Sequence, residues 1–166
     1  MITIYQADSQ HIPLIQDMAK IIWPIAFGEI LSSEQLAYMM DMMYSKGSLQ
    51  EQMEKKAHKF LIASKGKEPL GFASYELHYL GLPQLKIHKL YILPTAQGRG
   101  IGKEILTYLE TEGKKTGMKN MVLNVNKYNS KAFQFYEKQG FTKIKDEVIP
   151  IGNGYVMDDF TLKKKI

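Results

Sequence analysis

Glycine and arginine lie together in one short stretch, residues 97–102, which reads Gln-Gly-Arg-Gly-Ile-Gly and holds the only arginine of the chain. Before it, the unbroken apolar run 90–93 predicts a strand that is buried on both faces. After it, Ile101 and Ile105 begin a helical pattern. Glycines at such a turn leave backbone N–H groups free, and the N-terminus of a helix attracts anions. The stretch therefore predicts a phosphate-binding loop, with Arg99 facing a pyrophosphate.

Two common nucleotide-binding motifs do not fit this loop. A Walker loop requires serine or threonine after Gly-Lys, but Glu104 follows Gly102 and Lys103. A dinucleotide fingerprint requires a third glycine where Lys103 stands, and an acidic residue at the end of the next strand, where the chain has Asn124 and Asn126. The glycine spacing alone is also compatible with a tight strand-to-helix connection that binds no ligand.

A second segment, residues 129–141, supports one class of ligand. Asn129 opens a helical pattern that contains Tyr136. This segment and the loop at 97–102 resemble the two acetyl-CoA motifs of the GNAT superfamily of N-acetyltransferases. These are the Q/R-x-x-G-x-G/A loop and a later helix that an Asn opens and whose Tyr approaches the CoA sulfur. The resemblance covers residues 90–141 in the family's order and implies acetyl-CoA as the cofactor.

The resemblance also implies which residues bind that cofactor. Backbone groups of residues 90–92 would hydrogen-bond to pantetheine, because in this family the central strands splay apart and leave one strand edge unpaired. The loop would hold the pyrophosphate, and Asn129 would contact the pantetheine arm as well as cap its helix. The expected cofactor-binding residues are Leu90, Tyr91, Ile92, Gln97, Gly98, Arg99, Gly100, Ile101, Gly102, Lys103, Asn129, Lys131 and Tyr136.

Acetylation of an amine also needs an acid for the departing thiolate and a base for the amine proton. By resemblance, Tyr136 is the expected acid, although a core tyrosine would show the same helical spacing. His88 is the expected base, because strand alternation would place it on the face of Leu90, where some polyamine-acetylating relatives carry a glutamate. Glu76 acting through water, and a histidine without a catalytic role, are the alternatives.

The acetyl acceptor is indicated only by a looser match. Residues 23–40 resemble bacterial polyamine acetyltransferases of the PaiA type, which implies an apolar acceptor wall with carboxylates around a cationic amine. The expected substrate-binding residues are Trp23, Phe27, Glu34, Tyr38 and Asp41. A polyamine, another small primary amine, and a protein N-terminus or lysine all remain open as acceptors. A CoA-binding sensor that does not catalyse is a further alternative.

Composition excludes several other classes of protein. The 166 residues include no cysteine, which excludes disulfides and zinc–thiolate sites, and the four histidines do not pair at ligand spacing, so we expect no metal. The net charge of +5 comes from dispersed lysines, which argues against a nucleic-acid partner and suits an anionic cofactor. Without a signal sequence or membrane-spanning run, we expect a cytoplasmic protein that acts on a small-molecule amine, as a monomer or a homodimer.

The order of predicted elements gives one α/β (α+β) domain over residues 1–166. Strands are expected at 2–6, 59–64, 69–79, 84–93, 121–125, 141–149 and 154–162, and helices from Asp8 or Ser9, from Ser32 or Ser33, from Ser48, over 100–116 and over 130–139. Pro24 is expected to end the first helix at Trp23. The order matches the family's mixed, mostly antiparallel, twisted sheet, which has splayed central strands and is flanked by helices.

Overall fold

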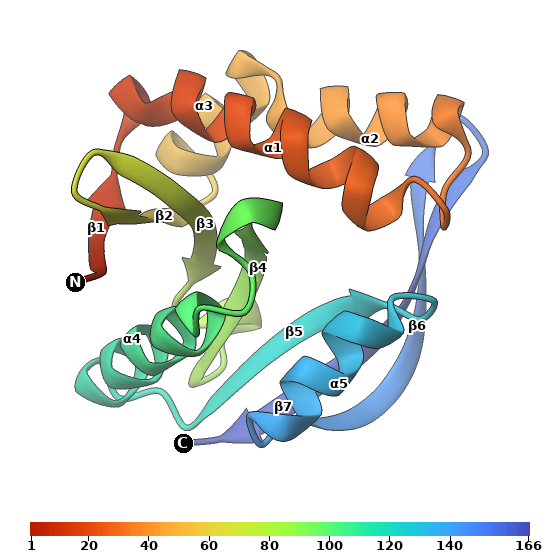
Figure 1. The fold of residues 1–166 in the computed structure, drawn as a ribbon. Helices are drawn as coiled ribbons and strands as arrows, with labels where there is room; N and C mark the ends of the chain where they lie inside the picture. Colours follow the sequence, from red (N-terminus) through yellow and green to blue (C-terminus); the bar gives the residue numbers. More distant parts are fainter.

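The computed structural model describes all residues, 1–166, and contains a seven-stranded sheet with helices on both faces (Figure 1). The strands are β1 (Thr3–Ala7), β2 (Lys59–Lys65), β3 (Glu68–Glu76), β4 (Gln84–Ile92), β5 (Asn120–Asn126), β6 (Thr142–Gly152) and β7 (Tyr155–Lys165). The helices are α1 (Ile12–Phe27), α2 (Ser33–Tyr44), α3 (Lys46–Glu54), α4 (Ile101–Lys115) and α5 (Ser130–Lys138). The predicted α/β architecture is confirmed. None of the helices combines the length and hydropathy needed to span a bilayer.

The sheet order is β1-β2-β3-β4-β5-β7-β6, and β4 and β5 are its one parallel pair. These two strands start side by side at Gln84 and Asn120 but pair only as far as Ile87 and Leu123. Beyond that point β4 stays paired with β3 and β5 stays paired with β7, so the two strands separate (Figure 1). The predicted splay is confirmed, and it leaves one edge of β4 free at residues 88–92.

Two hydrophobic cores lie on opposite faces of the sheet. Successive side chains of β2 point into different cores. Leu61 and Ala63 pack in the core of α4 and α5, whereas Phe60 and Ile62 pack in the core of α1, α2 and α3. All four side chains are almost completely buried. The gap between β4 and β5 is therefore bordered by α1 on one face and by α4 and α5 on the other.

The prediction that the first helix ends at Trp23 is wrong, because α1 continues through Pro24 to Phe27. An internal proline costs about 3 kcal/mol, whereas burial of a large apolar side chain contributes about 1.5–3 kcal/mol, and both Trp23 and Phe27 are buried on one face of the helix. Packing therefore outweighs the local preference. The third helix also starts earlier than predicted, since the Ser45 hydroxyl accepts a hydrogen bond from Ser48 N at 3.2 Å and caps α3.

Candidate active site

A cleft of about 800 Å³ lies where β4 and β5 separate. Its lining comes from α1, β4, the loop that leads into α4, β5 and α5. The predicted site residues that line it are Phe27, His88, Leu90, Tyr91, Ile92, Gln97, Gly98, Gly100, Ile101, Gly102, Lys103, Asn129, Lys131 and Tyr136. Residues from two separate sequence motifs thus face a single cavity.

The free edge of β4 presents backbone groups to this cleft. Leu90 and Ile92 pack against the core of α4 and α5, and the Tyr91 ring lies 5.7 Å from Trp23 and 6.3 Å from Phe27, between ring centroids. The side chains are therefore anchored in both cores, while N–H and C=O groups on the β5 side have no strand partner. A ligand with amide groups, such as pantetheine, can take the place of the missing strand.

The loop at 97–102 forms an anion-binding turn at the N-terminus of α4. Gly98 and Gly100 have φ angles of +79° and +75°, a left-handed conformation that favours glycine. The first hydrogen bond of the helix runs from Glu104 N to Gly100 O, so the three preceding N–H groups have no helical partner. These N–H groups and the positive end of the helix dipole suit a pyrophosphate.

The cations that face this turn come from two helices. Lys131 of α5 donates a hydrogen bond to Gln97 Oε1 at 2.9 Å, and Lys103 of α4 also lines the cleft. Arg99, which was expected to face the pyrophosphate, does not line the cleft, because its guanidinium lies 3.7 Å from the Glu68 carboxylate at the start of β3. The lysines therefore supply the positive charge that the sequence assigned to the arginine.

Helix α5 brings Asn129 and Tyr136 to the cleft. Asn129 Oδ1 accepts a hydrogen bond from Ala132 N at 3.2 Å, so this side chain caps the helix while it lines the cavity. Tyr136 is 8% exposed, and burial raises the pKa of its phenol well above the ordinary value. The phenol therefore keeps its proton at neutral pH and can act as a proton donor.

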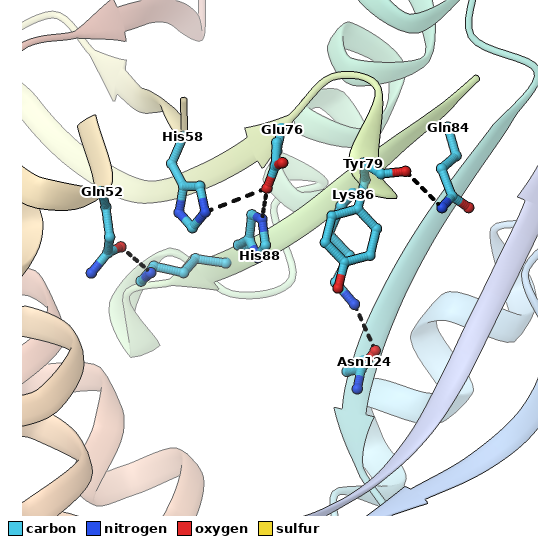
Figure 2. A network of polar contacts seen from close by, with 9 residues as sticks. Gln52, His58, Glu76, Tyr79, Gln84, Lys86, His88 and Asn124 are labelled. Carbon is cyan, nitrogen blue, oxygen red and sulfur yellow. Dashed lines mark hydrogen bonds and ion pairs between the residues drawn. The ribbon is translucent and has the colours of Figure 1, made fainter. Parts of the chain in front are cut away.

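Three ionisable side chains meet beside the cleft (Figure 2). Nε2 of His88 lies 2.9 Å from Glu76 Oε1, and Nε2 of His58 lies 3.5 Å from the same oxygen. The two imidazole rings are stacked, with centroids 3.8 Å apart. A metal ion could bridge their donor atoms, which lie within 4.8 Å of one another, although His88 and Glu76 already share a hydrogen bond. Sequence reasoning missed His58, because no local motif connects it to His88.

A bulge in β4 determines where His88 points. The register between β3 and β4 shifts at this residue, which has no partner on β3. Ile87 and Leu90, on either side of the bulge, consequently both face the core of α4 and α5. The prediction that His88 shares the face of Leu90 is therefore wrong, and the imidazole instead meets Glu76.

The surroundings of His88 favour its neutral form. Burial lowers its pKa, and the neighbouring His58 and Lys89 lower it further. Contact with the Glu76 carboxylate acts in the opposite direction. Burial in turn raises the pKa of Glu76 and lowers that of Lys89 to about 7. The lowered pKa leaves the lone pair of the imidazole free at neutral pH but weakens it as a proton acceptor, and the Glu76 carboxylate offsets this by stabilising the protonated form.

The aromatic residues predicted to bind the acceptor have different positions. Phe27 lines the cleft. Trp23 is 2% exposed, and its Nε1 donates a hydrogen bond to Tyr44 Oη at 3.0 Å, which ties α1 to α2. Tyr38 Oη donates to the Ile151 carbonyl at 2.6 Å and holds α2 against β6. Trp23 and Tyr38 therefore position elements around the cleft but do not line it.

The predicted carboxylates of α2, Glu34 and Asp41, are exposed and lie outside the cleft. They share the solvent-facing side of the helix because Met39 and Tyr44 occupy its buried side. Their positions thus do not support the expectation that these two carboxylates bind the acceptor.

A second polar network, which the sequence did not reveal, spans the sheet from β4 to β6. Lys86 Nζ donates to Asn124 Oδ1 at 2.7 Å (Figure 2). Asn124 Nδ2 donates to Glu147 Oε2 at 3.1 Å and to Asp159 Oδ2 at 3.3 Å. Asn124 lines the cleft, whereas Glu147 and Asp159 hydrogen-bond to it from behind and do not line the cavity themselves. In the sequence, the one indication of this network was the presence of polar residues at alternate positions of strands that were predicted to be buried.

Comparison with known proteins identifies the family. Residues 15–141, more than half of the chain, match the model of the acetyltransferase (GNAT) family. The chain is similar to a spermidine N(1)-acetyltransferase of Thermoplasma acidophilum, with 27% identity over 95% of this chain and 96% of the relative. It is 22% identical to an uncharacterised N-acetyltransferase of Lactobacillus delbrueckii subsp. lactis, over 99% and 98% of the two chains.

A solved structure gives the same result. The PaiA N-acetyltransferase of Thermoplasma acidophilum, in complex with coenzyme A, aligns over 100% of this chain and 99% of its own, with a TM-score of 0.82 and 25% identity. The free edge of β4 and the anion-binding turn at α4 fit the pantetheine and pyrophosphate of such a cofactor. The chain therefore belongs to the GNAT family of acetyltransferases and is an acetyl-CoA-dependent N-acetyltransferase.

Proposed function

We propose that the protein acetylates a primary amine of a small polycation such as spermidine, by direct attack of the amine in a ternary complex. The observation that carries this proposal is the single cleft that combines the anion-binding turn, Tyr136 and His88, with Glu76 hydrogen-bonded to His88 beside it. The spermidine N(1)-acetyltransferase activity named for one relative supports the choice of acceptor. When bound, acetyl-CoA supplies the acetyl group as an activated thioester.

His88 is the base in this proposal. A polyamine nitrogen has a pKa near that of lysine, ~10.4, so it arrives protonated and must lose a proton before it can attack. With Glu76 ionised, His88 Nε2–H donates to its carboxylate and Nδ1 carries the lone pair that accepts the proton. The carboxylate then stabilises the imidazolium that forms.

Tyr136 and the edge of β4 act on the other half of the reaction. A free N–H group of β4 would polarise the thioester carbonyl, since it has no strand partner to compete for it. The protonated phenol of Tyr136 would donate to the departing thiolate sulfur. After the attack, the nitrogen loses a second proton, which replaces the one that Tyr136 gave to the thiolate, and His88 releases the first proton to solvent before the next turnover.

An acceptor panel tests the proposal. The purified protein is given acetyl-CoA with spermidine, spermine, butylamine or a peptide with a free N-terminus, and acetylated products are identified by mass spectrometry. We expect the polyamines to be acetylated with the highest kcat/KM. Acetylation of the peptide alone would favour the protein N-terminal alternative. Binding of acetyl-CoA without any acetylated amine would favour the non-catalytic sensor.

A further inference from the structure

Asp159 is a buried carboxylate without a cationic partner. It is 6% exposed on β7 and lies across from Glu147 on β6 and from Asn126 on β5. Its side chain accepts one hydrogen bond, from Asn124 Nδ2 at 3.3 Å, and it takes part in none of the ion pairs of the chain. A buried carboxylate is costly unless a cation or several donors compensate it, so this group has capacity for a further partner.

The neighbouring charges do not provide that partner. Glu147 shares the amide of Asn124, accepts from Thr161 Oγ1 at 2.9 Å, and forms its own ion pair with Lys145 Nζ at 3.9 Å. Lys86 donates to the oxygen of Asn124 (Figure 2) and forms no ion pair with either carboxylate. Burial raises the pKa of the Asp159 carboxyl, an effect that Asn124 and Lys86 oppose and that Glu147 reinforces. The network therefore holds two carboxylates around one amide, with its ammonium group directed elsewhere.

The Asn124–Glu147–Asp159 network adjoins the proposed reaction centre. Asn124 and Asn126 line the cleft. Tyr79 lies between this network and the proposed base, because its ring centroid is 5.1 Å from Lys86 Nζ and 5.8 Å from the centroid of the His88 ring. Asn124 therefore stands between the cleft that it lines and the two carboxylates to which it donates.

We infer that Asp159 and Glu147 form a subsite for the second ammonium group of the acceptor. The inference rests on the proposed amine acetylation and assigns its specificity to β6 and β7. One amine of a polyamine binds at His88, and the next nitrogen supplies the direct cationic partner that Asp159 lacks. An ammonium group has three N–H donors, which suit the unused lone pairs of two adjacent carboxylates. An amine with a single charge cannot occupy both places.

Substrate preference in charge-neutralised variants tests the subsite. The ratio of kcat/KM for spermidine to that for butylamine is measured in the wild type, Asp159→Asn and Glu147→Gln. We expect each variant to lower this ratio by about tenfold or more, chiefly through a higher KM for spermidine. Asp159→Asn is nearly isosteric and keeps an oxygen that accepts from Asn124, so a melting curve should show a folded protein. Asp158→Asn, which removes the neighbouring carboxylate paired with Lys127, is the matched control and should keep the ratio.

Calorimetric titration of spermidine into the CoA-bound protein separates this inference from the catalytic proposal. Weaker spermidine binding in Asp159→Asn, but not in Asp158→Asn, supports the subsite. An unchanged spermidine affinity and an unchanged ratio in folded Asp159→Asn would overturn it. If the wild type acetylates none of the amines, the proposed function fails, whereas the titration still shows whether Asp159 binds a polyamine cation.

Discussion

The two walls of the cleft are built in different ways. The cofactor wall, which comprises residues 97–103 and the edge of β4 at 90–92, offers mainly backbone groups from one continuous stretch of chain. The acceptor wall presents His88 and Asn124 to the cleft, and Glu76, Glu147 and Asp159 hydrogen-bond to these two from behind, so its side chains come from five strands. Backbone recognition needs glycine at fixed positions, so it is visible in a sequence. Recognition by side chains from separate strands becomes visible only in the fold.

Tyr136 lies between the two walls, and its loss should have the largest effect. Tyr136→Phe keeps the packing of the ring but removes the proton donor, so we expect turnover to fall by about 10²–10⁴-fold. The affinity for acetyl-CoA, measured by calorimetry, should be unchanged. Tyr75→Phe, at a buried tyrosine outside the cleft, is the control. Wild-type turnover in Tyr136→Phe, with chemistry rate-limiting, would mean that another group protonates the thiolate.

Damage to the cofactor wall should weaken acetyl-CoA binding as well as slow turnover. Gly100→Val forces a β-branched residue into a φ of +75° at the anion-binding turn, and loss of two phosphate hydrogen bonds corresponds to about 100-fold weaker acetyl-CoA binding. Gly66→Val is a matched control, because Gly66 has a φ of +61° and equally open surroundings but lies in the β2–β3 turn. Equal acetyl-CoA affinity in the two folded variants would contradict the assignment of the loop.

Damage to the acceptor wall should have the opposite pattern. His88→Gln is expected to lower kcat/KM for spermidine by about 10–100-fold while acetyl-CoA affinity is retained, because Glu76 can still act through water. The deficit should grow as pH falls, since less of the amine is then unprotonated. His78→Gln changes an exposed histidine outside the cleft and serves as the control. A pH profile identical to that of the wild type would remove His88 from the base role.

The smallest expected effect is on stability. Burial, followed by the charges of Lys89 and Lys56, lowers the pKa of His58 to about 4, and the pKa of His88 is lowered as well. A histidine with a depressed pKa in the folded state takes up its proton first in the unfolded state. The stability that such a histidine contributes is therefore fully present above its pKa in the unfolded state, about 6.5, and is lost as the pH falls toward its pKa in the folded state.

We accordingly expect the free energy of unfolding in urea to decrease by about 1–2 kcal/mol between pH 7 and pH 5. The raised pKa of Glu76 partly opposes this loss, because that carboxyl takes up its proton more readily in the folded state. His58→Gln should reduce the pH dependence. An equal decrease in the wild type and in His58→Gln would show that other groups cause it.

The same contrast explains which parts of the fold and site were predictable. The turn at Gly98 and Gly100 follows from local sequence, and the strand and helix order follows from periodicity. The face of the sheet on which His88 lies could not be predicted, because one bulged residue reverses the alternation of side chains along β4. His58 and Asp159 were missed for another reason: their partners are set by strand order, which no short stretch encodes.

One structure would test the central claim most directly, namely that a single cleft combines a backbone cofactor wall with a side-chain acceptor wall. We propose crystals of Tyr136→Phe with acetyl-CoA and spermidine, in which slow turnover preserves both ligands. The account predicts the pyrophosphate at the N-terminus of α4, one spermidine nitrogen at His88 and the next nitrogen at Asp159. A spermidine bound on exposed α2 near Glu34 and Asp41, or a pyrophosphate away from residues 98–102, would contradict it.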